Sequence, residues 1–267
     1  MSRRVGAARR RGVARRHRTR RSSFALGLAL VLVSAIPRAG TAQRPTPSAP
    51  SVPPAAATAA DSAAILLLER VAEAYRGART LRAAFTQTLT PVGGGAPMTS
   101  RGEFLQAGAG RFAFRFAEPA EDRIVADGRA VWLYLPSTLR GQAIRLPRGV
   151  GAGAGLDLVA SLLTDPGRRY VVRALPDTTV AGRRETQVTL EPRAAGAPFT
   201  RATLRVDAAR RLIVAAALRE PSGLVRTLTF TNVRLGTRLP ADAFVFTPPA
   251  GVRVIDQAAL LGGVPPG

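Results

Sequence analysis

The chain has 267 residues, a formal net charge of +22, no cysteine and one histidine, His17. We expect the segment that holds His17 to be removed, and the folded part then lacks the usual side chains of thiol catalysis, imidazole base catalysis and zinc coordination. The composition therefore favours a binding protein over an enzyme and predicts no metal and no cofactor.

Residues 1–42 are typical of a cleaved secretory signal. An arginine-rich stretch without acids precedes an apolar run at 24–36, which is too short to span a bilayer comfortably, and small residues follow at 40–42. We expect general secretion, cleavage near Ala42 and a soluble periplasmic product. The Arg20-Arg21 pair leaves a twin-arginine route as the alternative, although Phe24 comes one place late for that pattern.

This signal carries eleven arginines and no acid, which leaves +11 of the net charge to the rest of the chain. A charge of that size ordinarily suggests nucleic acid, but export separates the protein from nucleic acid, so we expect none as a partner. Two interpretations remain. The arginines bind an anionic membrane face or an acidic protein, or they are solvated on outward strand faces, which the composition favours.

Residues 43–60 contain five prolines and almost no charge, and they predict a disordered Pro/Ala-rich linker. A single domain is expected at 61–257, followed by a flexible tail at 258–267. In the domain, Asp61 or Ser62 can cap a helix that continues at helical apolar spacing and stops at Gly77. Period-two patterns then predict antiparallel strands at 81–90, 100–106, 111–116, 121–126, 130–135, 142–146, 170–174, 185–191, 200–206, 212–219 and 224–233.

The clearest alternation is at 111–116, where Phe112, Phe114 and Phe116 share one face and arginines occupy the other. So many antiparallel strands in succession predict a meander and exclude a parallel nucleotide-binding sheet. A short apolar helix is expected at 156–164, after the glycine run 149–155. Because Pro147 precedes the glycines and no P-loop lysine follows, a mobile loop with a helical flap is preferred over a phosphate site.

One apolar sheet face with two or three helices can be buried in two ways. The helices can close an ordinary filled core, or they can form a lid over the cavity of an incompletely closed barrel. Periodicity does not separate these alternatives.

Three segments together indicate a family. They are Phe85-Thr-Gln-Thr88, the stretch 119–134 with Asp127-Gly128 and Trp132-Leu-Tyr134, and 244–252 with Pro248-Pro249. In order, spacing and position they resemble the periplasmic lipoprotein carrier family, LolA, over about residues 61–257. Features of these segments also have a local structural explanation. Asp127-Gly128 predicts a hairpin turn, and Pro248-Pro249 predicts the end of a strand. Trp132 and Tyr134 share one strand face, which looks either at the cavity or at a helix or solvent.

The resemblance implies an α+β fold with a single curved antiparallel sheet that forms an unclosed β-barrel, covered by two or three lid helices. It also implies a carrier that takes acylated lipoproteins from an ATP-driven inner-membrane exporter to an outer-membrane receptor. We expect a monomer. The residues expected to line the lipid-binding cavity are apolar side chains of the sheet and the flap: Phe85, Phe104, Phe112, Phe114, Phe116, Leu133, Leu158, Leu162 and Leu163.

One departure from the family concerns lid closure. The family has an arginine after the second strand that hydrogen-bonds the lid, whereas the matching stretch here, 106–110, has no basic residue. Arg111 and Arg115 are candidates to replace it. A relative that handles another lipid is therefore an alternative.

Two other function classes remain. A hydrolase could use the acids Glu118, Glu121, Asp122 and Asp127, but they flank a turn, where solvated acids are expected, and no Gly-x-Ser-x-Gly elbow is present. A periplasmic sensor of lipids or lipoproteins with the same fold is the second alternative. Such sensors commonly carry a second domain, and the end of this chain at Gly267 favours the carrier.

Overall fold

The structure is a computed structural model that describes residues 58–108, 110–147, 157 and 161–256. The predicted signal, the tail and all but the last three residues of the linker lie outside these ranges. The helix begins at Ala59, two residues before the expected start of the domain.

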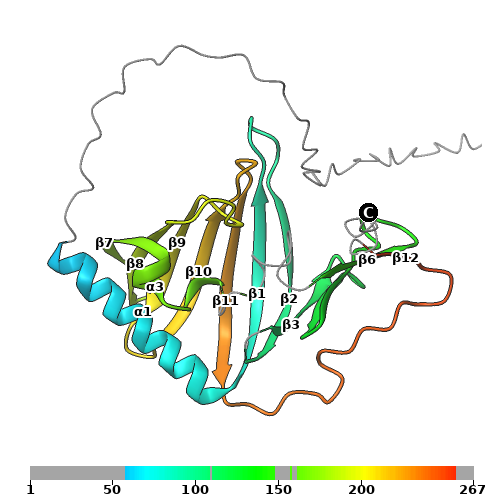
Figure 1. Cartoon of the computed structure of the whole chain (residues 1–267), viewed down its shortest axis with the longest axis horizontal. Coiled ribbons are helices and arrows are strands. Elements are labelled where there is room, and N and C mark those ends of the chain that lie inside the picture. Colours follow the sequence, from blue (N-terminus) through cyan, green and yellow to red (C-terminus); the bar gives the residue numbers. More distant parts are fainter. Residues whose placement is uncertain (1–57, 109, 148–156, 158–160, 257–267) are drawn as a thin grey trace, which may run out of the picture. The chain divides into compact units, whose positions relative to one another are not determined.

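Twelve strands form one sheet in the order β12-β6-β5-β4-β3-β2-β1-β11-β10-β9-β8-β7 (Figure 1). Neighbours are antiparallel except β12 and β6, which are parallel. The terminal strands β7 and β12 do not pair with each other, so the sheet is not closed. The strands are β1 Thr80–Thr90, β2 Met98–Ala107, β3 Arg111–Glu118, β4 Arg123–Asp127, β5 Ala130–Tyr134, β6 Gln142–Pro147, β7 Tyr170–Val180, β8 Arg183–Pro192, β9 Arg201–Asp207, β10 Leu212–Arg219, β11 Val225–Leu235 and β12 Arg253–Asp256.

The predicted single meander is wrong in one respect. Strands β1–β6 and β7–β11 are two meanders, and the pairing of β1 with β11 joins them. Phe85 of β1 lies opposite Phe230 of β11, at a separation of 145 positions along the chain. Both meanders contribute buried side chains to one large apolar cluster, so the joined sheet has one continuous apolar face, called here the inner face.

Helix α1, Ala59–Ala78, covers part of the inner face. It has a capping box, in which Asp61 N–H donates to the Thr58 hydroxyl and Thr58 N–H donates to the Asp61 carboxylate. Thr58 is therefore the N-cap, and Asp61, one of the two expected caps, is the third helical residue. The buried face of α1 packs Leu67, Leu68 and Val71 into the same apolar cluster as the sheet. A short helix, α3 Pro166–Arg169, precedes β7.

Glycine is required at position 102, where β2 meets β3. The register shifts there, and a Cβ on Gly102 would lie 2.1 Å from the carbonyl oxygen of Arg115. The two backbones could not approach so closely with any other residue, which keeps β2 and β3 paired across the irregularity.

The turn at Asp127-Gly128 is formed as predicted, with Gly128 at φ +94°. The Asp127 carboxylate accepts from the N–H groups of Arg129 and Ala130 and from Nε1 of Trp132. Burial would raise the pKa of Asp127, but these three donors hold it below its usual value. The acid is thus a structural part of the β4–β5 hairpin.

Candidate functional site

Five of the predicted lining residues form one aromatic cluster on the inner face. The ring centroids of Phe104 and Phe114 are 4.6 Å apart, and Phe85 lies 5.2 Å from both Phe114 and Phe116. Phe112 lies 6.1 Å from Phe114. Such spacings are typical of favourable aromatic pairs. The cluster therefore follows from the alternation on β1, β2 and β3, whose phenylalanines the sheet brings side by side.

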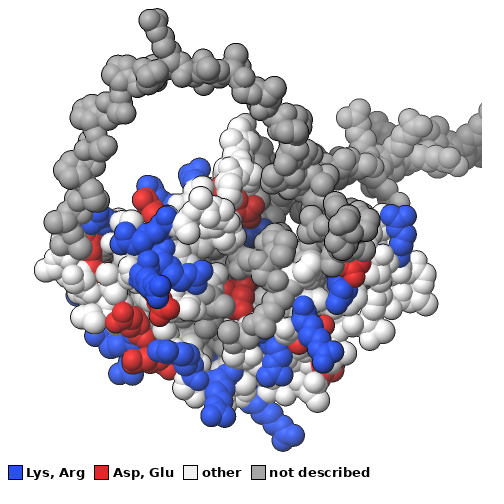
Figure 2. Space-filling view, viewed as in Figure 1, with Lys and Arg blue, Asp and Glu red and all other residues white. Residues whose placement is uncertain are grey.

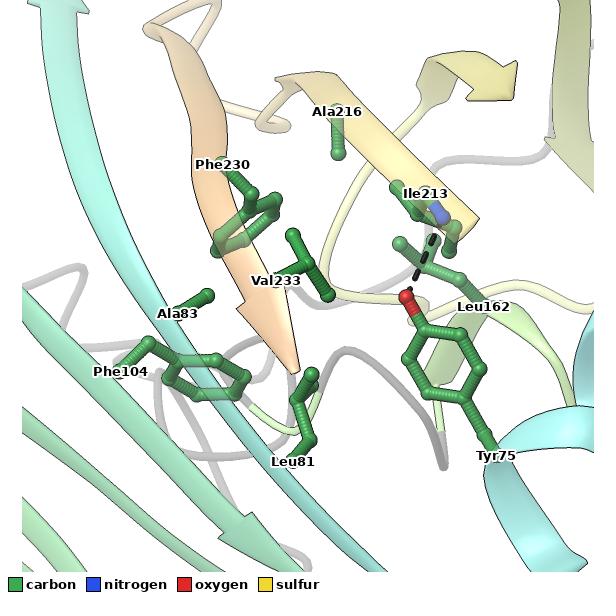
Figure 3. Close-up of a pocket in the computed structure, with 9 residues that line it drawn as sticks. All are labelled: Tyr75, Leu81, Ala83, Phe104, Leu162, Ile213, Ala216, Phe230 and Val233. Atoms are coloured by element: carbon green, nitrogen blue, oxygen red, sulfur yellow. Dashed lines mark hydrogen bonds between the residues drawn. The ribbon is translucent and has the colours of Figure 1, made fainter. Parts of the chain in front are cut away.

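Next to this cluster lies a small cavity, called here the hollow (Figure 3). Leu81, Ala83 and Phe104 border it from β1 and β2, and α1 contributes Tyr75. The remaining lining residues are Ile213 and Ala216 of β10, Phe230 and Val233 of β11, and Leu162. Its volume of about 20 Å³ has room for roughly one water molecule and not for an acyl chain. The inner face is thus nearly filled at this hollow.

Only Phe104 and Leu162 of the predicted set border the hollow itself. Leu133 and Leu163 are buried in the same apolar cluster, 8% and 3% exposed, and Leu158 lies outside the described residues. The prediction missed the contributions of α1, β10 and β11. The alternation in 212–233 was visible, but which of its residues face β1 depends on a pairing between strands far apart in the chain.

Three hydrogen bonds, at two residues of α1, join the helix to the sheet within the described residues. Near its start, the Asp61 carboxylate accepts from the Ala174 N–H at 2.8 Å and from the Arg173 guanidinium at 2.9 Å. Near its end, the Tyr75 hydroxyl accepts from the Ile213 N–H at 3.1 Å. The N–H of Thr58, then that of Ala174 and the Arg173 guanidinium, hold the pKa of Asp61 well below its usual range. Burial raises the pKa of Tyr75 to about 12, so the phenol stays neutral.

The stretch that lacks the family's arginine is linked to the segment between β6 and β7 by an acid instead. Nε2 of Gln106 donates to Asp157 at 2.7 Å, and the N–H of Gly110 donates to its other carboxylate oxygen at 2.6 Å. The carbonyl of Asp157 in turn accepts from the N–H of Ser161 at 2.8 Å. This connection positions Leu162 over the hollow.

Neither Arg111 nor Arg115 replaces that arginine. Arg111 stacks on Phe244 with its guanidinium carbon 5.7 Å from the ring centroid, and Arg115 lies 3.6 Å from the Asp242 carboxylate. Both partners belong to the segment after β11, on the opposite face of the sheet, here called the outer face. The suggestion that one of these arginines closes the lid is therefore wrong.

The outer face of β2–β5 is covered by residues 236–252, called here the strap. Leu105, Ala113 and Val125 form a separate apolar cluster with Ala243 of the strap. Trp132 and Tyr134 each lie 5.6 Å from the Phe246 ring, while Val131 and Leu133 belong to the inner cluster. Trp132 and Tyr134 thus face neither the hollow, nor a helix, nor open solvent. The strand expected to end at Pro248-Pro249 is absent, because 244–249 has no regular secondary structure.

Within the described ranges, no group of three or more metal-ligating side chains is placed to hold an ion. No helix described here is long and apolar enough to cross a bilayer. Two of the four acids near this turn have structural contacts: Asp122 accepts from the N–H and hydroxyl of Ser137, and Asp127 holds its hairpin.

The family model described as "Outer membrane lipoprotein carrier protein LolA" matches residues 76–150. An outer-membrane lipoprotein carrier protein of Methylibium petroleiphilum is 36% identical over 186 residues, which cover 67% of this chain and 84% of that protein. The chain belongs to the outer-membrane lipoprotein carrier family. The corresponding protein of Cupriavidus taiwanensis is 31% identical over 185 residues, covering 68% of this chain and 83% of that protein.

The solved LolA superfamily protein of Nitrosomonas europaea is 16% identical, covers 68% of this chain and 96% of that chain, and gives a TM-score of 0.37. That score is too low to add to the family assignment. The family match at 76–150 includes the first two of the three segments that indicated the family, and the strap with the third lies beyond it.

Proposed function

We propose that this protein is a periplasmic carrier that binds the acyl chains of lipoproteins at its inner face and transfers them from the inner to the outer membrane. The observation that carries the proposal is the continuous apolar inner face of an unclosed sheet, with a hollow whose described lining residues are apolar or aromatic. Membership of the lipoprotein carrier family supports it. An inner-membrane exporter and an outer-membrane receptor are the expected partners, and the carrier acts as a monomer.

The physical need for a carrier follows from the cost of exposing acyl chains to water. Each methylene contributes about 0.8 kcal/mol, so a chain of ~16 carbons represents on the order of 12 kcal/mol. Unaided diffusion between membranes is then negligible. A protein that covers the chain with its own apolar surface removes most of this barrier without catalysing any reaction.

Loading of the hollow requires it to enlarge, because a volume of about 20 Å³ does not hold an acyl chain. The elements that close it are α1, through Tyr75, and the residues near Leu162. Their apolar side chains compete with acyl chains for the same surface of the sheet, so cargo stabilises the open state by replacing contacts that the closed state makes internally. The few polar contacts of α1 make its displacement less costly than breaking a strand ladder.

A detergent-free mixture of the purified protein with an acylated lipoprotein tests the proposal. Size exclusion should give a soluble one-to-one complex, and the same lipoprotein with its acylated cysteine replaced by serine should give none. No complex with the acylated form, together with binding of free lipid alone, would refute lipoprotein carriage and support the lipid-sensing alternative.

A pair of alanine variants locates the binding surface. Ala216 borders the hollow and is fully buried, whereas its neighbour Ala217 lies half-buried on the other face of β10. Ala216→Leu should fill the hollow and weaken complex formation at least about tenfold if the chain enters there, at a stability cost of ~1–3 kcal/mol. Ala217→Leu should leave binding unchanged. Equal binding by both folded variants would place the cargo elsewhere.

A further inference from the structure

A second, larger cavity, called here the mouth pocket, opens beside the inner face and has a volume of about 620 Å³. One wall comes from β3–β5 and includes Phe112 and Val131. The other comes from α3, the start of β7 and residues 192–199, and includes Phe199. One wall belongs to the meander β1–β6 and the other to the meander β7–β11. The pocket therefore lies between parts of the two meanders that do not pair with each other.

Three arginines border this pocket. Arg168 and Arg169 end α3, and Arg193 follows β8. Arg193 N–H donates to the carbonyl of Arg169 at 3.0 Å, and its Nε donates to the carbonyl of Tyr170 at 3.1 Å. The Arg169 guanidinium carbon lies 5.5 Å from the centre of the Tyr170 ring. These contacts hold Arg193 against the end of α3 and the start of β7, and Figure 2 shows basic side chains gathered over α3.

The described acids near the pocket form no ion pair with Arg168 or Arg193. Asp157 is the carboxylate among the described lining residues, and its two oxygens accept from Gln106 and Gly110. Asp165 precedes α3 and is exposed. For Arg168 and Arg193, the described part of the chain shows no ion pair. Arg168 and Arg193, set against one carboxylate that already accepts two hydrogen bonds, give the pocket a positive potential.

Apolar surface lies directly beside these cations. Phe199 stacks on Tyr170 with ring centroids 5.8 Å apart, and Phe112 connects the pocket to the phenylalanine cluster of the inner face. We propose that the mouth pocket binds a single-chain amphiphile with an anionic head, the phosphate or carboxylate lying at Arg168, Arg169 and Arg193 and the chain lying along Phe112, Val131 and Phe199. Because Phe112, Val131 and Phe199 belong to the apolar cluster of the inner face, this inference deepens the proposed function and rests on acyl-chain binding at that face.

Isothermal titration of the purified protein below the micelle concentration tests the proposal with three probes. These are lyso-phosphatidylglycerol, lyso-phosphatidylcholine with the same chain, and inorganic phosphate. We expect the anionic lysolipid to bind at least about fivefold more tightly than the zwitterionic one, with the difference shrinking as salt is added, because exposed ion pairs are weak and screened. Phosphate alone should bind much more weakly than the anionic lysolipid.

The double variant R168Q/R193Q should lose the preference for the anionic head and retain binding of the zwitterionic lysolipid. The matched control R183Q/R234Q removes the same charge at exposed arginines outside the pocket and should behave as the wild type. Equal affinity for both lysolipids, or an unchanged preference in R168Q/R193Q, would overturn the proposal. Phosphate binding as tight as the anionic lysolipid would also overturn it, since the site would then serve a free anion. Lipoprotein binding, measured separately, can fail without affecting any of these results.

Discussion

The inner and outer faces of the sheet both carry apolar residues and both are covered, the inner face by a helix and the outer face by an irregular segment. Helix α1 covers the inner face as a separate element, and three hydrogen bonds at Asp61 and Tyr75 join it to the sheet in the described residues. The strap covers the outer face and is fixed by backbone hydrogen bonds at both ends, from Gly236 N–H to Thr80 and from Arg253 N–H to Gly141. Beyond the second end, β12 pairs with β6.

This difference suggests which covering can move. Lifting α1 exposes apolar surface that an acyl chain can cover again, whereas lifting the strap also breaks backbone hydrogen bonds and the β12–β6 pairing. We infer that the strap is a permanent covering and that ligand exchange takes place at the inner face.

The largest expected effect is loss of the inner aromatic cluster. Phe114 is 1% exposed and contacts the rings of Phe85, Phe104, Phe112 and Phe116. Phe114→Ala should lower the free energy of unfolding by about 3–5 kcal/mol, because it removes buried apolar area and leaves a cavity. Urea unfolding measures the change. A loss below about 1 kcal/mol would show that the inner face repacks freely.

A smaller effect is expected from the strap. Phe246 is half-buried against Trp132 and Tyr134, so Phe246→Ala should cost about 1–2 kcal/mol. Trp132 is the chain's single tryptophan, and its fluorescence should shift to longer wavelength as water reaches it. Val245→Ala is the control, since Val245 is 66% exposed and should change neither stability nor emission. An unchanged spectrum in Phe246→Ala would contradict the strap as a tight covering.

The last effect concerns the attachment of α1 and depends on pH. Because its pKa is lowered on folding, ionised Asp61 contributes stability above its unfolded pKa of about 3.9, and this contribution is lost as the pH falls through the lower folded value. Asp61→Asn should therefore flatten the fall of unfolding free energy below about pH 4. Glu69→Gln, at an exposed position of the same helix, should keep the wild-type slope. Identical slopes in wild type and Asp61→Asn would show that the carboxylate does not fasten α1.

Much of this comparison could be predicted from the sequence. Strands β1–β11 begin and end within two residues of the predicted ones, except that β7 continues six residues further, to Val180. The alternation of Phe112, Phe114 and Phe116 placed them on one side of the sheet. Period two is a local property that a strand imposes on its own residues. The hairpin at Asp127-Gly128 was equally local, since it depends on one acid and one glycine.

The packing of the strap and the hydrogen bond from Gln106 to Asp157 could not be predicted in the same way. Phe244-Val-Phe246 looks like a strand, yet Phe246 packs on Trp132 without joining a ladder. The link from Gln106 to Asp157 spans 51 positions, and no spacing rule connects an amide in one strand to an acid in a distant loop. Both contacts exist because the sheet brings together segments that have no local relation.

The sequence by itself determined that this protein folds as an antiparallel sheet with one apolar face and a covering helix, because patterning at periods of 2 and 3.6 residues acts within each element. Only the tertiary structure decided that β1 pairs with β11, that Trp132 faces the strap, and that three arginines gather beside the mouth of the sheet. Those outcomes depend on which distant surfaces bury the most apolar area together, a property of the whole chain that no single segment carries.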